Sequence, residues 1–173
     1  MTIRNYTTQI PVDKTILEIE SILIKFGAKG IYKEYTGAKI SGLMFYLERD
    51  GQKIPFKIPS SVEKSRRVIM EAVEEKKLPR KYYDEPFRTE QGERVTWRII
   101  KDWIDSQLSL LEINFADAIE IMLPYAYNPI ENKTMYQKFM ENKKEYLALE
   151  DKQDVEEKWT EEKDCLLLFC FTL

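Results

Sequence analysis

The segment from Gln91 to Glu112 holds the strongest apolar pattern in the chain, and it limits the folds open to the rest. Its apolar side chains recur at steps of three and four residues, the spacing of one face of a helix. They are Trp97, Ile100, Ile104, Leu108 and Leu111, flanked by Ile99, Trp103 and Leu110. We expect a helix of about five turns, buried on two sides, on which the helical half of the chain is organised.

The first part of the chain predicts a helix followed by three strands. Asp13 or Thr15 is expected to cap the helix, and Gly27 stands where a glycine often ends one. The strands are expected over residues 31–36, 40–48 and 52–58, because turn signals separate these runs. Pro55 places the last strand at a sheet edge, with the side chains of Lys53 and Lys57 directed to solvent.

A second helix is expected after Pro59, where Ser60 and Glu63 have the spacing of a capping box. Its buried stripe would consist of Val62, Ile69, Ala72 and Val73. Residues 79–90 contain two prolines and no clear period, which predicts a linker or a structured loop. Two short helices are expected later, one stopped by Pro124 and one over residues 135–143.

These elements predict an α+β fold with a three-stranded antiparallel meander flanked by helices. We expect one domain over residues 1–144, divided into 1–78, the loop 79–90 and a helical part 91–144. Residues 145–164 carry nine acidic and three basic residues, which predicts an acidic extension. An apolar strand is expected at the C-terminus, and its side chains offer a homodimer contact: Leu166, Leu167, Leu168 and Phe169.

Several familiar kinds of enzyme site are missing from the sequence. The 173 residues include no His, no glycine-rich phosphate loop and no Cys pair with zinc spacing. Cys165 and Cys170 are expected to be reduced thiols. Glu112, Asp117 and Glu120 form a weak alternative as a metal site. We therefore expect a non-enzymatic cytoplasmic protein with no catalytic residue, cofactor, metal or membrane segment.

Positive charge is concentrated in the middle of the chain. Residues 53–101 contain 13 basic and 8 acidic residues, whereas the whole chain has a net charge of −3. Basic groups among aromatic rings favour contact with phosphates and stacking on bases. The candidate binding residues are Lys64, Arg66, Arg67, Arg80, Lys81, Arg88, Arg94, Arg98 and Lys101, and the candidate stacking residues are Tyr82, Tyr83 and Phe87.

The alternative for the cations of the long helix is a set of ordinary ion pairs. Arg98 and Asp102 stand four residues apart, as do Lys101 and Asp105, which suits pairing on a solvated helix face. Trp97 lies on the apolar stripe, which favours the core over a stacking role.

The order helix, three strands, helix over residues 13–77 resembles that of a double-stranded-RNA-binding domain, whose second helix presents lysines to phosphates. Lys64, Arg66 and Arg67 would lie near that place.

A second resemblance is to a group of small uncharacterised proteins of bacteriophages and other mobile elements. It rests on four short runs, Asn5-Tyr6-Thr7-Thr8, Lys25-Phe26-Gly27-Ala28, Gly42-Leu43-Met44-Phe45 and Leu123-Pro124-Tyr125, and on the longer run Glu93-Arg94-Val95-Thr96-Trp97-Arg98-Ile99-Ile100-Lys101-Asp102-Trp103. This resemblance implies a genomic setting and no particular activity. In that setting we expect a counter-defence inhibitor that binds a host defence protein or its phosphorylated small ligand. The alternative is an accessory protein that binds nucleic acid through residues 64–101.

Overall fold

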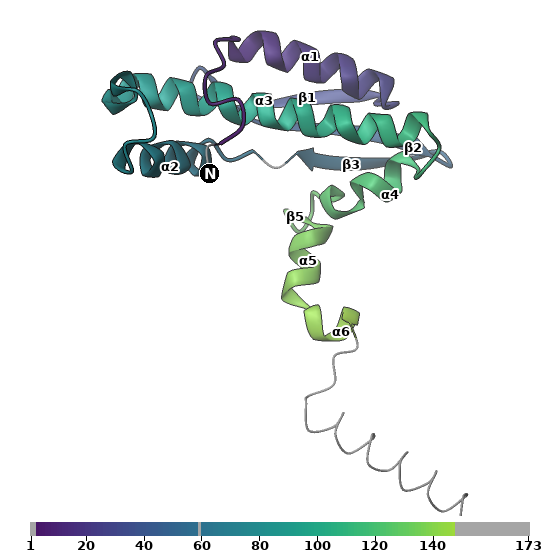
Figure 1. Cartoon of the computed structure of the whole chain (residues 1–173). Helices are drawn as coiled ribbons and strands as arrows, with labels where there is room; N and C mark the ends of the chain where they lie inside the picture. The colour runs from purple at the N-terminus through teal and green to yellow at the C-terminus, as the bar shows by residue number, and fades with distance from the viewer. Residues whose placement is uncertain (1–2, 59, 148–173) are drawn as a thin grey trace, which may run out of the picture. The chain divides into compact units, whose positions relative to one another are not determined.

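The computed structural model describes residues 3–58 and 60–147. It divides into two compact units, one ending at Met135 and one beginning at Tyr136. The first unit has the predicted α+β fold, with an N-terminal helix, a three-stranded antiparallel meander and a helical region (Figure 1). The predicted apolar C-terminal strand and its dimer contact lie outside the described residues.

The first helix, α1, spans Val12–Lys25, and its N-terminus differs from the prediction. Neither Asp13 nor Thr15 caps it, because the N-cap position is Pro11. Thr15 is buried instead, and its hydroxyl donates to the carbonyl oxygen of Pro11 at 3.3 Å. The predicted end is confirmed, since Gly27 follows the helix with a φ of 94°, a backbone conformation that favours glycine.

The sheet contains β1 (Gly30–Thr36), β2 (Lys39–Arg49) and β3 (Gln52–Ile58), and β2 lies in the centre. The turn between β2 and β3 is formed by Asp50 and Gly51, both with positive φ, as a two-residue hairpin requires. The strand order β1-β2-β3 confirms the predicted position of β3 at an edge of this sheet.

The two faces of β3 differ as its sequence alternation predicts. Phe56 and Ile58 are buried, and Lys53 is exposed. Lys57 is half-buried, and its ammonium group lies 2.9 Å from a carboxylate oxygen of Glu34 on β1. The lysine side of the sheet is thus bound by an ion pair across the strands.

The second helix, α2, spans Val62–Glu74 and buries Ile69, Ala72 and Val73, as predicted. The predicted capping box is wrong, because Ser61 holds the N-cap position without a side-chain hydrogen bond. The hydroxyl of Ser60 donates instead to the carbonyl oxygen of Ser41 on β2. The Ser60 side chain, which the local spacing predicted as a cap of α2, thus makes a tertiary contact with β2.

The long helix, α3, spans Glu85–Glu112, so it begins six residues before the prediction. The segment expected to be a loop contains a 3₁₀ helix, η1 (Arg80–Tyr83), and the first turn of α3. Pro86 lies in that first turn, where a missing N–H costs no helical hydrogen bond. Pro86, one of the two prolines that predicted a loop, therefore lies in the first turn of α3.

Asp84 caps α3, since its carboxylate accepts a hydrogen bond of 3.0 Å from the backbone N–H of Phe87. We expect Asp84→Ala to lower the free energy of unfolding by about 1 kcal/mol, because the N–H loses its partner. Urea unfolding followed by circular dichroism measures this change. Asp84→Asn, which keeps the acceptor, serves as the control, and an equal loss in both variants would contradict the capping role.

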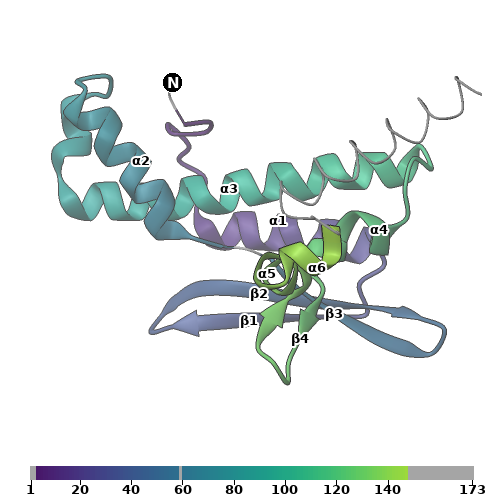
Figure 2. The same cartoon turned by 90° about the horizontal axis from the view of Figure 1, so that it is seen from below.

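Two apolar cores share α3. The first lies between the sheet, α1 and α3, and its largest buried side chains include Phe45, Phe56 and Trp97. The second joins α2, η1 and α3 and includes Tyr82 and Val95. Figure 2 shows α1 and α3 over one face of the sheet. The partner of α1 on the sheet is therefore α3, and the second helix, which carries Lys64, Arg66 and Arg67, packs against α3.

The rest of the first unit is built from short elements. They are α4 (Ala118–Met122), the 3₁₀ helix η2 (Leu123–Tyr125), β4 (Tyr127–Asn128) and β5 (Lys133–Thr134). The predicted helix before Pro124 is thus present, whereas the hairpin of β4 and β5 was not predicted. The predicted helix after residue 135 is α5 (Met135–Glu141), which is followed by α6 (Lys143–Leu147). No helix in the described part of the chain is long and apolar enough to cross a membrane.

Candidate functional site

The residues predicted to form one basic face are divided between different sides of α3. On one side, Gly92 and Thr96 contact Arg66 and Ser65 of α2. On another side, Phe87, Gln91 and Arg94 line a pocket together with Lys81 and the N-terminal segment. The positive charge of residues 53–101 is therefore distributed over several surfaces.

The pocket beside η1, called here the Lys81 pocket, has a volume of about 240 Å³. Its lining residues are Thr7, Gln9, Lys81, Tyr82, Phe87, Gln91 and Arg94. The ammonium nitrogen of Lys81 lies 5.4 Å from the centroids of the Tyr82 and Phe87 rings. Arg94 forms an ion pair with Glu90, and its guanidinium also donates to the side-chain oxygen of Gln91 at 3.4 Å. Four of the predicted residues thus meet in one cavity.

Gln91 builds one wall of this pocket. Its side chain is buried, and its amide nitrogen donates to the carbonyl oxygens of Tyr6 and Thr8, both at 2.8 Å. These bonds hold the N-terminal segment against α3 and place Thr7 and Gln9 in the lining. None of these three residues is predicted by the sequence patterns, although a glutamine beside the apolar stripe of α3 is an available signal.

The aromatic candidates differ in exposure. Tyr82 belongs to the second core, where 1% of its surface is exposed and its hydroxyl donates to the carbonyl oxygen of Tyr6 at 3.0 Å. Burial raises the pKa of this phenol. Tyr83 is 52% exposed and lines an open depression with Arg80. Phe87 is half-buried in the Lys81 pocket, so Tyr82 has no free ring face for stacking, whereas Tyr83 and Phe87 keep part of theirs exposed.

The side chain of Arg88 forms hydrogen bonds with the end of η1. One nitrogen of its guanidinium donates to the carbonyl oxygens of Tyr82 and Tyr83, at 3.3 and 3.4 Å. Its Nε is buried without a hydrogen-bond partner. Arg88 therefore contacts backbone carbonyls at the end of η1, and its phosphate contact stays a prediction.

The basic side chains in the middle of α3 form ion pairs with carboxylates of the chain. Arg98 reaches Glu18 of α1 at 2.6 Å, in place of the expected Asp102. Lys101 pairs with Asp105 at 3.0 Å, as the helical spacing indicated. Asp102 instead accepts a hydrogen bond of 2.9 Å from Asn5. Arg98 therefore joins α3 to α1, and Lys101 pairs within α3.

The remaining cations lie on α2 and at the start of η1. Arg66 lies 4.0 Å from a carboxylate oxygen of Glu63 and 3.8 Å from one of Glu85. Lys64, Arg67 and Arg80 are exposed, and none has an ion-pair partner among residues 3–58 and 60–147. These three are free to meet an external anion.

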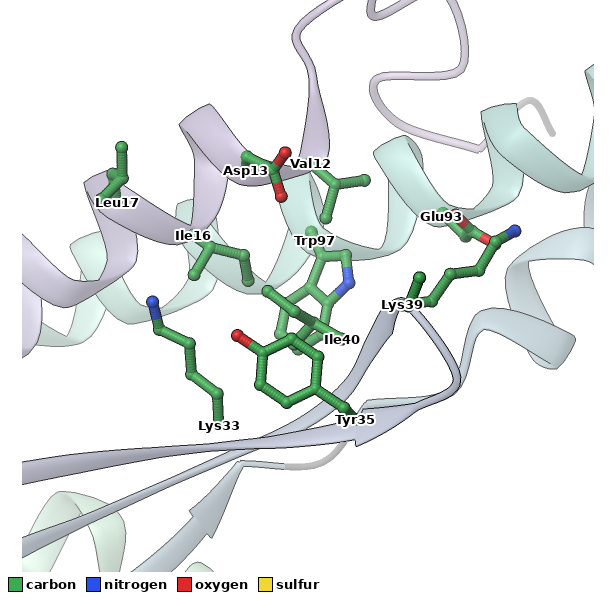
Figure 3. Close-up of a pocket in the computed structure, with 11 residues that line it drawn as sticks. Val12, Asp13, Ile16, Leu17, Lys33, Tyr35, Lys39, Ile40, Glu93 and Trp97 are labelled. Atoms are coloured by element: carbon green, nitrogen blue, oxygen red, sulfur yellow. The ribbon is translucent and has the colours of Figure 1, made fainter.

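A larger pocket, of about 390 Å³, lies between α1, the hairpin of β1 and β2, and α3 (Figure 3). The buried ring of Trp97 and the side chains of Ile16 and Ile40 form its apolar part. Lys39 forms an ion pair with Glu93 at the rim. This pocket is not predictable from local sequence patterns, because its residues come from three separate segments.

A second ion pair on this rim joins β1 to α1. The ammonium of Lys33 lies 2.5 Å from a carboxylate oxygen of Glu20. The hydrogen bond to Glu20 is the largest cause of the raised pKa of Lys33. The two lysines of the pocket are thus neutralised by carboxylates of the chain itself.

Of the three carboxylates considered as a metal site, Asp117 has a structural role. The side chain of Asp117 caps α4 by accepting hydrogen bonds from the N–H groups of Ile119 and Glu120, at 2.7 and 3.0 Å. These bonds lower the pKa of Asp117. No group of three Cys, Asp or Glu residues in the described part of the chain is arranged to hold a metal ion.

Comparison of the chain with models of known protein families, with curated proteins and with solved structures gives no match.

Proposed function

We propose that this chain acts by binding, without catalysis, and that its Lys81 pocket holds a phosphate-bearing ligand. The observation that carries the proposal is the convergence of Lys81 and Arg94, from η1 and α3, on one cavity. Lys81 has no carboxylate partner among the described residues, and its ammonium group lies over the rings of Tyr82 and Phe87. An ammonium group that lacks a counter-ion attracts an anion.

The other groups of the pocket suit a phosphate. The side chains of Thr7, Gln9 and Arg94 offer hydrogen-bond donors to phosphate oxygens. The exposed part of the Phe87 ring offers an apolar surface for a sugar or a base. The pocket, with a volume of about 240 Å³, is large enough for one chemical group and too small for a folded partner. The ligand is therefore a phosphorylated small molecule or one phosphate of a larger molecule.

This proposal agrees with the expected setting in a mobile element. A small protein that sequesters the phosphorylated ligand of a host defence protein inhibits that defence by mass action, without turnover. We therefore favour a counter-defence role exerted on such a ligand.

Nucleic-acid binding is the second candidate function. It is favoured by Lys64 and Arg67, which are exposed on α2 without carboxylate partners in the described part of the chain. Contacts of this kind bind the phosphate backbone without reading sequence, so their affinity falls steeply with salt.

Two matched variants separate these candidates. We expect Lys81→Gln to weaken the binding of a nucleoside monophosphate about 10- to 100-fold, because a charge-assisted hydrogen bond contributes roughly 1.5 to 3 kcal/mol. The control, Lys64→Gln with Arg67→Gln, removes positive charge from α2 and is expected to leave this affinity unchanged. Isothermal titration at low salt with the nucleoside monophosphate and with a single-stranded oligonucleotide measures both.

Two results would contradict the pocket. One is the absence of binding of the nucleoside monophosphate to the unaltered chain at low salt. The other is loss of affinity in the control variant but not in Lys81→Gln. If the control variant alone loses affinity for the oligonucleotide, the second candidate function is supported in place of the first.

A further inference from the structure

Within the described part of the chain, the strand β1 has an unpaired edge. The strand order β1-β2-β3 leaves β1 with a neighbour on one side only. The irregularity between β1 and β2 places the extra residue, Ser41, on β2, so the alternation of β1 stays regular. A regular edge strand offers its free backbone N–H and C=O groups to another strand.

The helix above this edge carries exposed apolar side chains. Leu17 and Ile24 are 60% and 64% exposed, and they stand seven residues apart, which places them on one face of α1. Tyr35 of β1 is 59% exposed and lines the pocket of Figure 3 together with Leu17. The helix layer and the strand layer therefore both present apolar groups beside the same edge.

The middle of β1 and the middle of the Leu17–Ile24 face of α1 are joined by an ion pair. Lys33 is the middle residue of β1, and Glu20 lies midway between Leu17 and Ile24 on α1. The ion pair between Lys33 and Glu20 joins these two midpoints at 2.5 Å. A two-fold axis that passes beside this ion pair, along the free edge of β1, would bring β1 beside an antiparallel β1 of another copy, and α1 beside an antiparallel α1.

The charges at the ends of this surface complement each other under that axis. Asp13 lies at one end of α1, and Lys25 and Lys29 lie at the other. None of the three has an ion-pair partner among the described residues. The axis brings Asp13 of one copy near Lys25 and Lys29 of the other, while each Lys33 at the centre keeps its own Glu20.

We infer that the edge of β1 and the Leu17–Ile24 face of α1 form a dimer interface that takes a second copy of this chain. A second copy is favoured over an unrelated peptide because the surface is complementary to itself, as a two-fold interface requires. The dimer has a continuous sheet of six strands, with Leu17 of each copy against Ile24 of the other. This surface is separate from the C-terminal contact expected from the sequence, and it does not depend on the proposed ligand.

Sedimentation of the full chain over a range of concentrations tests the inference. We expect a dimer in the unaltered chain, and a dissociation constant about 100-fold or more higher for Leu17→Glu with Ile24→Glu, because apolar burial is lost and carboxylates meet across the axis. The control is Ile113→Glu with Ile130→Glu, since both residues are exposed on other elements. A monomer at all concentrations, or a dimer unaffected by the first pair of substitutions, would overturn the inference.

Cross-linking tests the antiparallel arrangement. In a chain with Cys165→Ser and Cys170→Ser, we expect a Leu17→Cys variant mixed with an Ile24→Cys variant to form a mixed disulfide dimer. Each variant alone should form much less disulfide, because the arrangement separates like positions. Equal disulfide formation by each variant alone would show a different docking geometry and reject this one.

Discussion

Trp97→Ala should lower the free energy of unfolding by about 3 to 5 kcal/mol, the loss typical of a large aromatic residue removed from a core. Trp97 is fully buried in the first core and also lines the pocket of Figure 3. Since small domains have total stabilities of roughly 5 to 15 kcal/mol, this loss is a large fraction of the total.

Urea unfolding monitored by far-ultraviolet circular dichroism measures this loss. The matched control is Trp103→Ala, because Trp103 lies on the same helix but is only partly buried, against Tyr125. We expect a clearly smaller loss in the control. Equal losses in the two variants would contradict the central position of Trp97.

Tyr82→Ala is expected to cause a loss of similar size, about 3 to 4 kcal/mol. Its ring contacts Phe87 edge-on with the centroids 5.3 Å apart, and 1% of its surface is exposed. Tyr82→Phe should cost only about 1 kcal/mol, because it removes one hydrogen bond and keeps the ring. Thermal or urea unfolding of both variants gives the comparison.

The neighbouring Tyr83 supplies the control for Tyr82. Tyr83 is 52% exposed, so Tyr83→Ala should have a much smaller effect on stability. If Tyr82 were a stacking residue, Tyr82→Ala would reduce ligand binding and leave the unfolding free energy unchanged. That result would contradict its assignment to the second core.

The strands and most helices followed from local signals in the sequence. Asp50 and Gly51 define a tight turn, and Gly27 ends a helix, because the backbone at these positions needs a positive φ. Pro55 indicated the edge position of β3, because proline cannot donate a hydrogen bond to a neighbouring strand. Such features depend on neighbouring residues, so a single sequence is enough to predict them.

The starts of the helices were harder to predict, because a side chain that could cap a helix can instead make a tertiary contact. Ser60 had the spacing of a cap, but it donates to Ser41 on β2. Thr15 was expected to cap α1, but it is buried one turn inside the helix. Contacts distant in sequence decide such cases, and local spacing does not contain them.

The candidate site was predicted only in part, for a related reason. The sequence places the cations close together along the chain, but it does not say which side of α3 each one occupies. Arg98 pairs with Glu18, a residue 80 positions away, and this partner cannot be recognised from helical spacing. Lys81, Phe87 and Arg94 were identified, whereas the wall provided by Thr7, Gln9 and Gln91 required the tertiary structure.

The sharing of α3 by two cores restricts how this helix can move. Val95 belongs to the second core and Trp97 to the first, although only one residue separates them. Successive positions on a helix point in different directions, so turning α3 about its axis to suit one core would withdraw side chains from the other. Packing in both cores therefore resists rotation of α3, and it determines which side of the helix lines the Lys81 pocket.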